Sequence, residues 1–282
     1  MQWIQKDYQS DQKGSKMKCL TAHSLKEAIR LYKQNPNFAL LAGGSDLNVQ
    51  IFNKSIKHEG LIALHPIKKL AKIKCTQKSA KIGALCTISD IIDHESIQKH
   101  FPLLLEMQND FASKQIRNMA TIGGNIANAS PFSDLIPLLL VLNAKIKVIS
   151  SKGKRTIALK DLYRGYKKLD LNNEILISII LPIKEHQFYY KKIAPRKRLA
   201  IAKLSLAVTK GKKFRVSGSA LNSSHRRFKH IEKCFNAKQT SDRALKEAID
   251  QDIAPSTSYR SDPKYKKQVL FNMLKEAIEK LS

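Results

Sequence analysis

The chain has 282 residues, of which 43% are hydrophobic and 26% are charged, as in an ordinary globular protein of one large domain or two to three smaller ones. No apolar run is long enough to span a bilayer, and the first residues lack the apolar core of a signal peptide, so we expect a cytoplasmic protein. The four cysteines contain no Cys-x-x-Cys pair, which argues against a zinc or iron–sulfur site on this chain.

The formal net charge of +28 is distributed unevenly: residues 1–140 hold 18 Lys and Arg against 11 Asp and Glu, whereas residues 141–282 hold 33 against 12. A nucleic-acid hypothesis starts from such an asymmetry. However, the chain has no RNA-binding aromatic signature, zinc finger or recognition-helix pattern, so the sequence disfavours nucleic-acid binding. Two interpretations remain open: a solvated lysine-rich surface, or a surface over residues 145–168 and 191–198 that docks acidic partners.

In chain order, residues 1–17 predict a polar extension, and a helix then begins at a capping box of Ser24 and Glu27 and stops at Asn35-Pro36. Residues 38–43 predict a short buried strand that leads into Gly43-Gly44. Further strands are expected over residues 60–67 and 79–86, followed by a helix over residues 89–99.

The pattern of residues 102–119 predicts a helix that ends just before a second glycine pair, Gly123-Gly124. A buried helix is expected over residues 134–144, a hairpin over 145–159 with Gly153 at its tip, and a strand over 174–182. From Tyr189 the pattern changes to strands and then to two helices, over residues 226–235 and 262–281. We therefore predict an α+β protein with a domain boundary near residues 182–188.

The two glycine pairs are the strongest chemical signal in the sequence. A Gly-Gly pair after a buried strand lets the backbone approach a ligand and allows positive φ, so that successive N–H groups can turn to one side and hold phosphate oxygens. Two such loops facing each other would suit a diphosphate, although neither is a Walker loop or a GxGxxG motif. The alternative, favoured for the first pair alone, is a tight turn between packed elements.

The stretches LLAGGSDL (residues 40–47) and IRNMATIGGNIANASPFSDLIPLLLVLNA (residues 116–144) together resemble the FAD-binding medium subunit of the molybdenum hydroxylase family, of xanthine dehydrogenase and carbon monoxide dehydrogenase type. The resemblance continues through KIGALCTISDI, NNEILISIILP, YYKKIAPRKRLAIAKLSLAV and SGSALNSSHRR, and covers roughly residues 18–282. It implies a two-subdomain FAD-binding domain of the vanillyl-alcohol-oxidase (PCMH) type over residues 18–184, split near residue 58. A C-terminal α+β domain over residues 185–282 follows, and residues 1–17 have no counterpart.

The resemblance also implies the cofactor-binding residues. Two loops would cradle the FAD diphosphate, an aromatic residue and an aliphatic residue would line the flavin, and a carboxylate and a lysine would lie near the nucleotide and the ring. These residues are Leu40, Leu41, Ala42, Gly43, Gly44, Ser45, Asp46, Leu47, Phe111, Thr121, Ile122, Gly123, Gly124, Asn125, Asp134, Ile177 and Lys192. As alternatives, Phe111 could be a core residue on a helix, and Asp134 could cap the helix that follows it.

Two positions depart from the family pattern. Ser45 replaces the more usual Thr and keeps the hydroxyl, and Ala200 replaces an acidic residue common in the larger xanthine dehydrogenases. No catalytic acid–base residue and no metal site is expected on this chain, because the cofactor carries the redox chemistry.

By the same resemblance, the chain would relay electrons from iron–sulfur clusters of a partner subunit through FAD to NAD+ or another acceptor. The substrate would be hydroxylated on a molybdopterin subunit of the same complex. Two alternatives stay open: a stand-alone flavin-dependent reductase or oxidase, and a basic binding protein whose flavin site has decayed.

Overall fold

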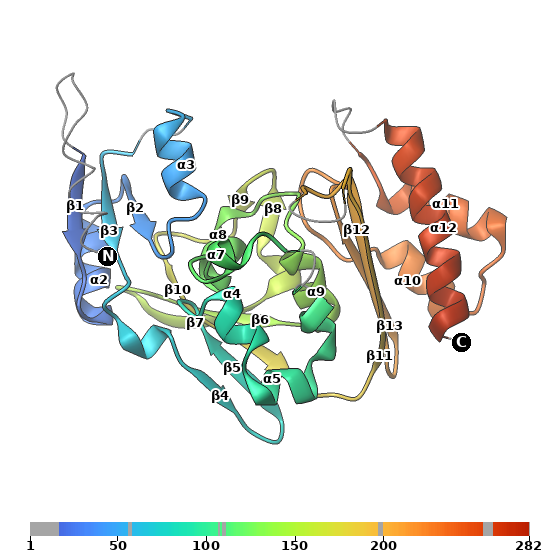
Figure 1. Ribbon diagram of the computed structural model, residues 1–282, viewed down its shortest axis with the longest axis horizontal. Helices are drawn as coiled ribbons and strands as arrows, with labels where there is room; N and C mark the ends of the chain where they lie inside the picture. Colours follow the sequence, from blue (N-terminus) through green and yellow to red (C-terminus); the bar gives the residue numbers. More distant parts are fainter. Residues whose placement is uncertain are drawn as a thin grey trace.

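The computed structural model describes residues 17–55, 58–106, 108, 111–196, 200–255 and 262–281, and it confirms the predicted α+β class (Figure 1). Among the described residues, three larger sheets follow one another along the chain, each with its own helices, and a fourth sheet has only two strands. Except for Met17, the predicted N-terminal extension lies outside the described residues. None of the described helices combines the length and the apolar character that crossing a membrane requires.

The first sheet is parallel, with the strand order β1 (Lys18–Thr21), β3 (Gly60–Ala63), β2 (Phe38–Leu41). Its crossover helices are α2 (Leu25–Gln34) and α3 (Leu47–Phe52). Ser24 caps α2 as predicted, because its Oγ accepts a hydrogen bond of 3.1 Å from the backbone N–H of Glu27. The sheet continues through β3 beyond residue 58, and β2 ends one residue before the loop of the first glycine pair.

The second sheet is antiparallel and lies centrally in the molecule (Figure 1). Its strands, in sheet order, are β4 (Ile73–Cys75), β5 (Ser79–Gly83), β10 (Ile175–Pro182), β6 (Lys145–Ser150) and β7 (Gly153–Ala158). The predicted hairpin is confirmed as β6 and β7, with Gly153 at φ 119°. The short elements around this sheet are η1 (Lys68–Leu70), α4 (Ile88–Ile92), α5 (Glu95–His100), η2 (Pro102–Glu106), α7 (Lys114–Arg117), α8 (Ile122–Asn128), α9 (Leu135–Val141), η3 (Leu159–Asp161), β8 (Tyr163–Gly165) and β9 (Lys168–Leu169).

Two predicted helices of this region are wrong in extent. The helix expected over residues 89–99 is divided into α4 and α5. The pattern of residues 102–119 instead yields the 3-10 helix η2 and the single turn α7. Ala112 has a left-handed backbone with φ 46°, which cannot continue a helix, and Ser113 then caps α7 through its side chain.

The third sheet, β11 (Gln187–Ile193), β12 (Leu204–Lys210) and β13 (Phe214–Ser219), is an antiparallel meander. Helices α10 (Lys229–Asn236) and α12 (Pro263–Leu281), expected from the sequence, pack on it, and α11 (Asp242–Asp252) is an additional helix beside them. Helix α9 packs against β12 and β13, so it lies between the second and third sheets. The Thr209 hydroxyl of β12 donates to the Val141 carbonyl of α9 at 3.1 Å, which ties these two parts together.

Candidate functional site

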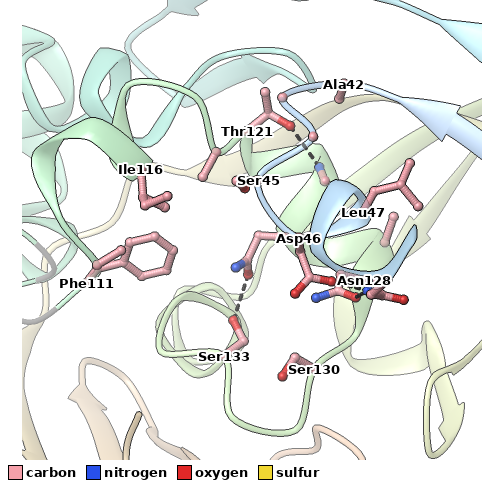
Figure 2. A pocket seen from close by; sticks show the side chains of 18 of the residues that line it. Ala42, Ser45, Asp46, Leu47, Phe111, Ile116, Thr121, Asn128, Ser130 and Ser133 are labelled. Carbon is pink, nitrogen blue, oxygen red and sulfur yellow. Dashed lines mark hydrogen bonds between the residues drawn. The ribbon is translucent and has the colours of Figure 1, made fainter. Parts of the chain in front are cut away.

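A cavity of about 920 Å³ lies where the loop after β2, the segment around α8, and residues near the start of β12 meet (Figure 2). Its volume is at the upper end of the range of roughly 300–1,000 Å³ typical of small-molecule and cofactor sites. Leu40, Phe111 and Ile201 contribute apolar surface, whereas the two glycine-bearing segments contribute polar groups. Such a lining suits a long ligand with both an aromatic and a strongly polar part.

The loop of the first glycine pair passes directly against the backbone that precedes α8. A Cβ on Gly43 would lie 1.7 Å from the Met119 carbonyl oxygen, so only glycine permits this approach. Gly44 has φ 68°, the left-handed conformation that the sequence analysis anticipated. Within the described parts of the chain, the backbone N–H groups of Gly43, Gly44, Ser45 and Asp46 donate to no protein acceptor. All four residues line the cavity, and N–H groups without a protein acceptor are the kind of donor that can hold an anionic ligand.

The second glycine pair is not a loop, which differs from the sequence-based expectation: Gly123 and Gly124 lie in the first turn of α8. The N–H of Gly123 donates to the Ala84 carbonyl at 2.9 Å, and that of Gly124 donates to Thr121 Oγ1 at 3.1 Å. The N–H of Asn125 donates to the Thr121 carbonyl at 2.9 Å. The segment therefore offers the cavity side chains and the bare Cα of Gly124, while its backbone donors hold the protein together.

Side-chain hydrogen bonds connect the segment of the first glycine pair to the segment of the second across the cavity wall. The Gln50 side chain on α3 donates to the Asp46 carboxylate and, at 3.2 Å, to Asn128 Oδ1 on α8. Farther along, the Ser133 hydroxyl donates to Asn125 Oδ1 at 2.7 Å (Figure 2). The polar side chains are thus oriented by one another before any ligand binds.

Asp134 and Lys192 form a buried ion pair beside the cavity, with 2.7 Å between Oδ2 and Nζ. Asp134 stands at the N-cap position of α9 but makes no capping hydrogen bond, so the helix-cap alternative is wrong. Instead, Ser133 Oγ accepts a hydrogen bond of 3.3 Å from the Ile136 N–H. The carboxylate of Asp134 therefore pairs with Lys192 and forms part of the cavity wall.

Twelve of the residues implied by the resemblance line the cavity, and five do not. The lining residues are Leu40, Ala42, Gly43, Gly44, Ser45, Asp46, Leu47, Phe111, Thr121, Gly124, Asn125 and Asp134. Phe111 precedes α7 in a loop rather than on a helix. Their assignment as cofactor contacts remains a prediction.

The five other residues do not line the cavity. Leu41 and Ile122 belong to hydrophobic cores, and Gly123 packs on Ala84. Ile177 packs in the core that includes α2. Lys192 reaches the wall through Asp134.

Several polar residues of the lining were not predicted from the sequence. Gln50 follows Asp46 by one helical turn, a spacing that could have indicated a shared face. Asn128, Ser130 and Ser133 lie within the second motif itself but were not singled out. Ala200 and Ile201 also contribute to the wall.

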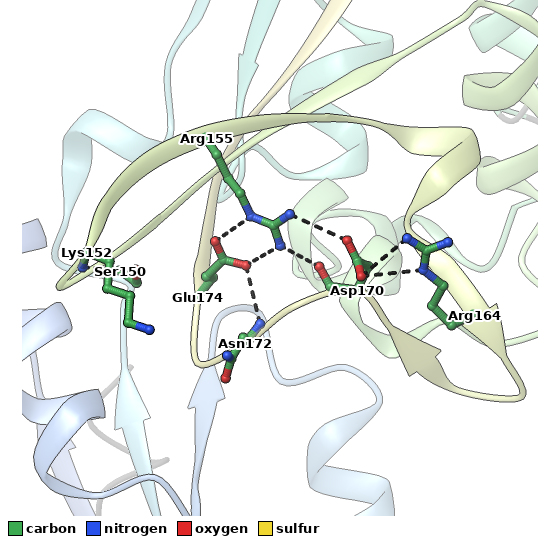
Figure 3. Close-up of polar contacts among 7 residues, drawn as sticks. All are labelled: Ser150, Lys152, Arg155, Arg164, Asp170, Asn172 and Glu174. Atoms are coloured by element: carbon green, nitrogen blue, oxygen red, sulfur yellow. Dashed lines mark hydrogen bonds and ion pairs between the residues drawn. The ribbon is translucent and has the colours of Figure 1, made fainter.

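The basic segment over residues 145–168 is partly neutralised within the chain. Arg155 forms a two-pronged contact with Glu174, at 2.7 and 2.6 Å, and also binds Asp170, which in turn contacts Arg164 (Figure 3). Hydrogen bonding to Arg155 lowers the pKa of Glu174. The two arginines are therefore less available to a partner than the sequence suggests, and Lys197 and Arg198 lie outside the described residues.

Comparisons with known proteins agree with this geometry. The profile of the family described as "FAD binding domain in molybdopterin dehydrogenase" matches residues 15–184. The xanthine dehydrogenase FAD-binding subunit of Escherichia coli is 28% identical over 275 residues, covering 91% of this chain and 93% of that protein. The glyceraldehyde dehydrogenase medium chain of Sulfolobus acidocaldarius is 28% identical over 271 residues, covering 93% and 96%.

Among solved structures, the carbon monoxide dehydrogenase of Hydrogenophaga pseudoflava, in a form that lacks the Mo-pyranopterin moiety, superimposes with a TM-score of 0.86. It is 26% identical, and the match covers 94% of this chain and 96% of that one. The chain therefore belongs to the FAD-binding subunits of the molybdenum hydroxylase family, of xanthine dehydrogenase and carbon monoxide dehydrogenase type, and is an FAD-dependent oxidoreductase component.

Proposed function

We propose that the chain holds FAD in the cavity and passes electrons from iron–sulfur clusters of a partner subunit to NAD+ or another acceptor. The observation that carries this proposal is the loop of residues 43–46: all four residues line the cavity, and their N–H groups have no acceptor in the described chain. A diphosphate needs such donors, and a loop without side chains at two positions lets it approach closely. FAD supplies the redox chemistry, and the protein supplies binding, orientation and electrostatics.

Each part of the wall has a proposed role. The loop of residues 43–46 binds the diphosphate, with the Ser45 hydroxyl as a further donor. From the other segment, the side chains of Thr121 and Asn125 face the same ligand, and Gly124 leaves space for it. Phe111 offers an aromatic surface for an aromatic ring system.

The Asp134–Lys192 pair has a different role. The Asp134 carboxylate, which lines the cavity, accepts hydrogen bonds from ribose or ribityl hydroxyls, because an ionised carboxylate has several lone pairs. The Lys192 ammonium, whose side chain is only 4% exposed, holds the Asp134 carboxylate in place on the cavity wall through the ion pair.

The partners follow from the names of the relatives, which describe an FAD-binding subunit and a medium chain. We propose that this chain likewise assembles with an iron–sulfur subunit and with a molybdopterin subunit that hydroxylates the substrate. The exposed cations Lys145, Lys167 and Lys168 are candidates for contacts with acidic surfaces of these partners.

The relay is tested on the purified chain loaded with FAD. The bound flavin is reduced chemically without oxygen, and its visible absorbance is followed after NAD+, a quinone or oxygen is added. We expect rapid reoxidation by one of these acceptors and accelerated reduction when the reduced iron–sulfur subunit is the donor. A flavin that stays reduced with every acceptor, or ignores that donor, would contradict the relay.

A further inference from the structure

We infer that His225, from the C-terminal part of the chain, is a positioning residue that fixes the cavity turn of residues 130–133. It acts through the carbonyl of Ser130 and without contacting the ligand itself. This inference rests on the proposed function only in that the turn is part of the cofactor cavity.

The turn is a compact unit that shapes one side of the cavity. Ala129 ends α8 in a left-handed conformation with φ 50°, and the chain then bends so that the Ser133 N–H donates to the Ser130 carbonyl at 2.9 Å. Ser130, Phe132, Ser133 and the following Asp134 all line the cavity. A displacement of this turn therefore moves several cavity groups together.

His225 makes the second hydrogen bond to the same carbonyl, with 2.6 Å between Nε2 and the Ser130 oxygen. A carbonyl oxygen only accepts, so Nε2 carries the proton and donates it. The imidazole is 3% exposed, and the Tyr163 ring meets it edge-on with 5.5 Å between the ring centroids. Burial lowers the His225 pKa to about 4, so the ring is a neutral donor with a single tautomer at neutral pH.

A neighbouring contact acts on the next carbonyl of the turn. The N–H of Ala220 donates to the Pro131 carbonyl at 2.8 Å, and Ala220 itself has φ 61°. A left-handed alanine is strained and persists only where its surroundings hold it. Residues 220 and 225 thus hold two successive carbonyls of the turn, so the C-terminal part fixes a segment of a cavity that is lined, apart from Ala200 and Ile201, by residues 39–134.

The consequence reaches the polar side chains of the site. Ser133, at the end of the turn, donates to Asn125 Oδ1 at 2.7 Å, and the adjacent Asp134 binds Lys192. If the hydrogen bond from His225 to the Ser130 carbonyl is lost, the Ser133 and Asp134 side chains lose part of their fixed orientation. The ligand must then order them itself, which weakens binding.

The experiment compares two substitutions of similar length and opposite hydrogen-bonding capacity. His225→Gln keeps an N–H donor, whereas His225→Met has none. The control is Thr209→Val, which removes the hydrogen bond from β12 to the Val141 carbonyl of α9, two residues that do not line the cavity. FAD affinity, thermal melting and amide hydrogen exchange of residues 130–134 without FAD are measured for all three and for the unaltered chain.

We expect His225→Met to weaken FAD binding by roughly threefold to tenfold, the size of one net hydrogen bond, and to speed exchange in the turn. His225→Gln should remain near the unaltered chain in both, and Thr209→Val should lower the melting temperature without either effect. Equal FAD affinity and exchange in the Met and Gln variants would overturn the inference. So would an affinity loss in Thr209→Val as large as that in His225→Met. If the unaltered chain bound no FAD, the proposed function would fail, while hydrogen exchange would still decide the role of His225.

Discussion

Lys192 and Asp134, 58 positions apart in the sequence, form an ion pair of 2.7 Å whose side chains are only 4% and 11% exposed. Lys192 lies on β11 of the third sheet, and Asp134 lies at the start of α9. The pair therefore joins the C-terminal part of the chain to the cavity wall. Because both side chains are poorly solvated, removing one of them leaves the other charge largely out of contact with water.

Replacing either partner alone is expected to be costly. Lys192→Met leaves a buried carboxylate and Asp134→Asn leaves a buried ammonium, so each should lower the free energy of unfolding by about 3–5 kcal/mol. The double variant should lose less than the two single losses together, since both charges of the pair are then removed at once. Urea unfolding of the four proteins measures this coupling, and strictly additive losses would show that the pair contributes no coupling.

The loop of the first glycine pair lies so close to the backbone before α8 that alanine substitutions at Gly43 and at Gly165 should differ sharply in their effects. Gly43→Ala places a Cβ 1.7 Å from the Met119 carbonyl oxygen, so the loop or the segment before α8 must move. Gly165→Ala is the matched control, because its nearest neighbour would be the flexible Lys168 side chain at 3.9 Å. We expect the Gly43 variant to melt several degrees lower and to bind FAD poorly, with the Gly165 variant unchanged. Equal melting curves would contradict the packing of this loop.

The glycines also show which part of the site was predictable. The end of β2 and the positive φ at Gly44 follow from local pattern, because a buried strand before a Gly-Gly pair leaves few backbone choices. Gly123 and Gly124 carry the same letters but adopt helical geometry. Thr121 caps the helix there, and the Ala84 and Cys86 carbonyls bind the segment to the rest of the protein. These partners are distant in sequence, so the letters alone do not distinguish a loop from a helix.

Other features depend on tertiary contacts that no local pattern records. The break at Ala112 interrupts a run with helical periodicity, and it turns Phe111 toward the cavity. Asp134 and Lys192 were each placed near the ligand by resemblance, but their pairing requires α9 to pack against the third sheet. Helix α11 was missed although Leu245, Ala248 and Ile249 lie at helical spacing and the Ser241 side chain caps its first turn.

Gln50 bridges Asp46 and Asn128 by hydrogen bonds, so we expect its substitution to weaken FAD binding more than it lowers stability. Gln50→Leu removes the donor that joins Asp46 to Asn128 and frees both side chains, so FAD affinity should fall by roughly threefold to tenfold. The control is Gln98→Leu, since Gln98 donates to the Ile92 carbonyl away from the cavity. Both variants should unfold at similar urea concentrations. If only the Gln98 variant lost affinity, the bridge would have no role in the site.

The buried imidazole of His225 makes the stability of the folded protein depend on pH, and its lowered pKa fixes the direction of that dependence. The pKa of His225 is about 4 in the folded chain, against about 6.5 when unfolded. Between these values the unfolded state binds more protons, so stability rises with pH and is fully present above pH 6.5. As the pH falls toward 4, protonation of His225 in the unfolded state should lower the free energy of unfolding by about 3 kcal/mol. Urea unfolding from pH 4 to pH 7 should therefore show a smaller acid loss in His225→Gln than in the unaltered chain, and identical profiles would contradict a buried neutral imidazole.

The central claim, that the cavity holds FAD against the glycine-bearing segments, is tested most directly through Gly124. Gly124 lines the cavity, and a Cβ there would lie 2.9 Å from the Thr121 hydroxyl that caps α8, so this hydroxyl must shift while no other atom is approached closely. The measurement is the visible absorbance spectrum after reconstitution with FAD, with circular dichroism to confirm folding. We predict one bound FAD in the unaltered chain and none in a folded Gly124→Val. A colourless unaltered chain, or a Gly124→Val variant that retains full FAD, would contradict the account.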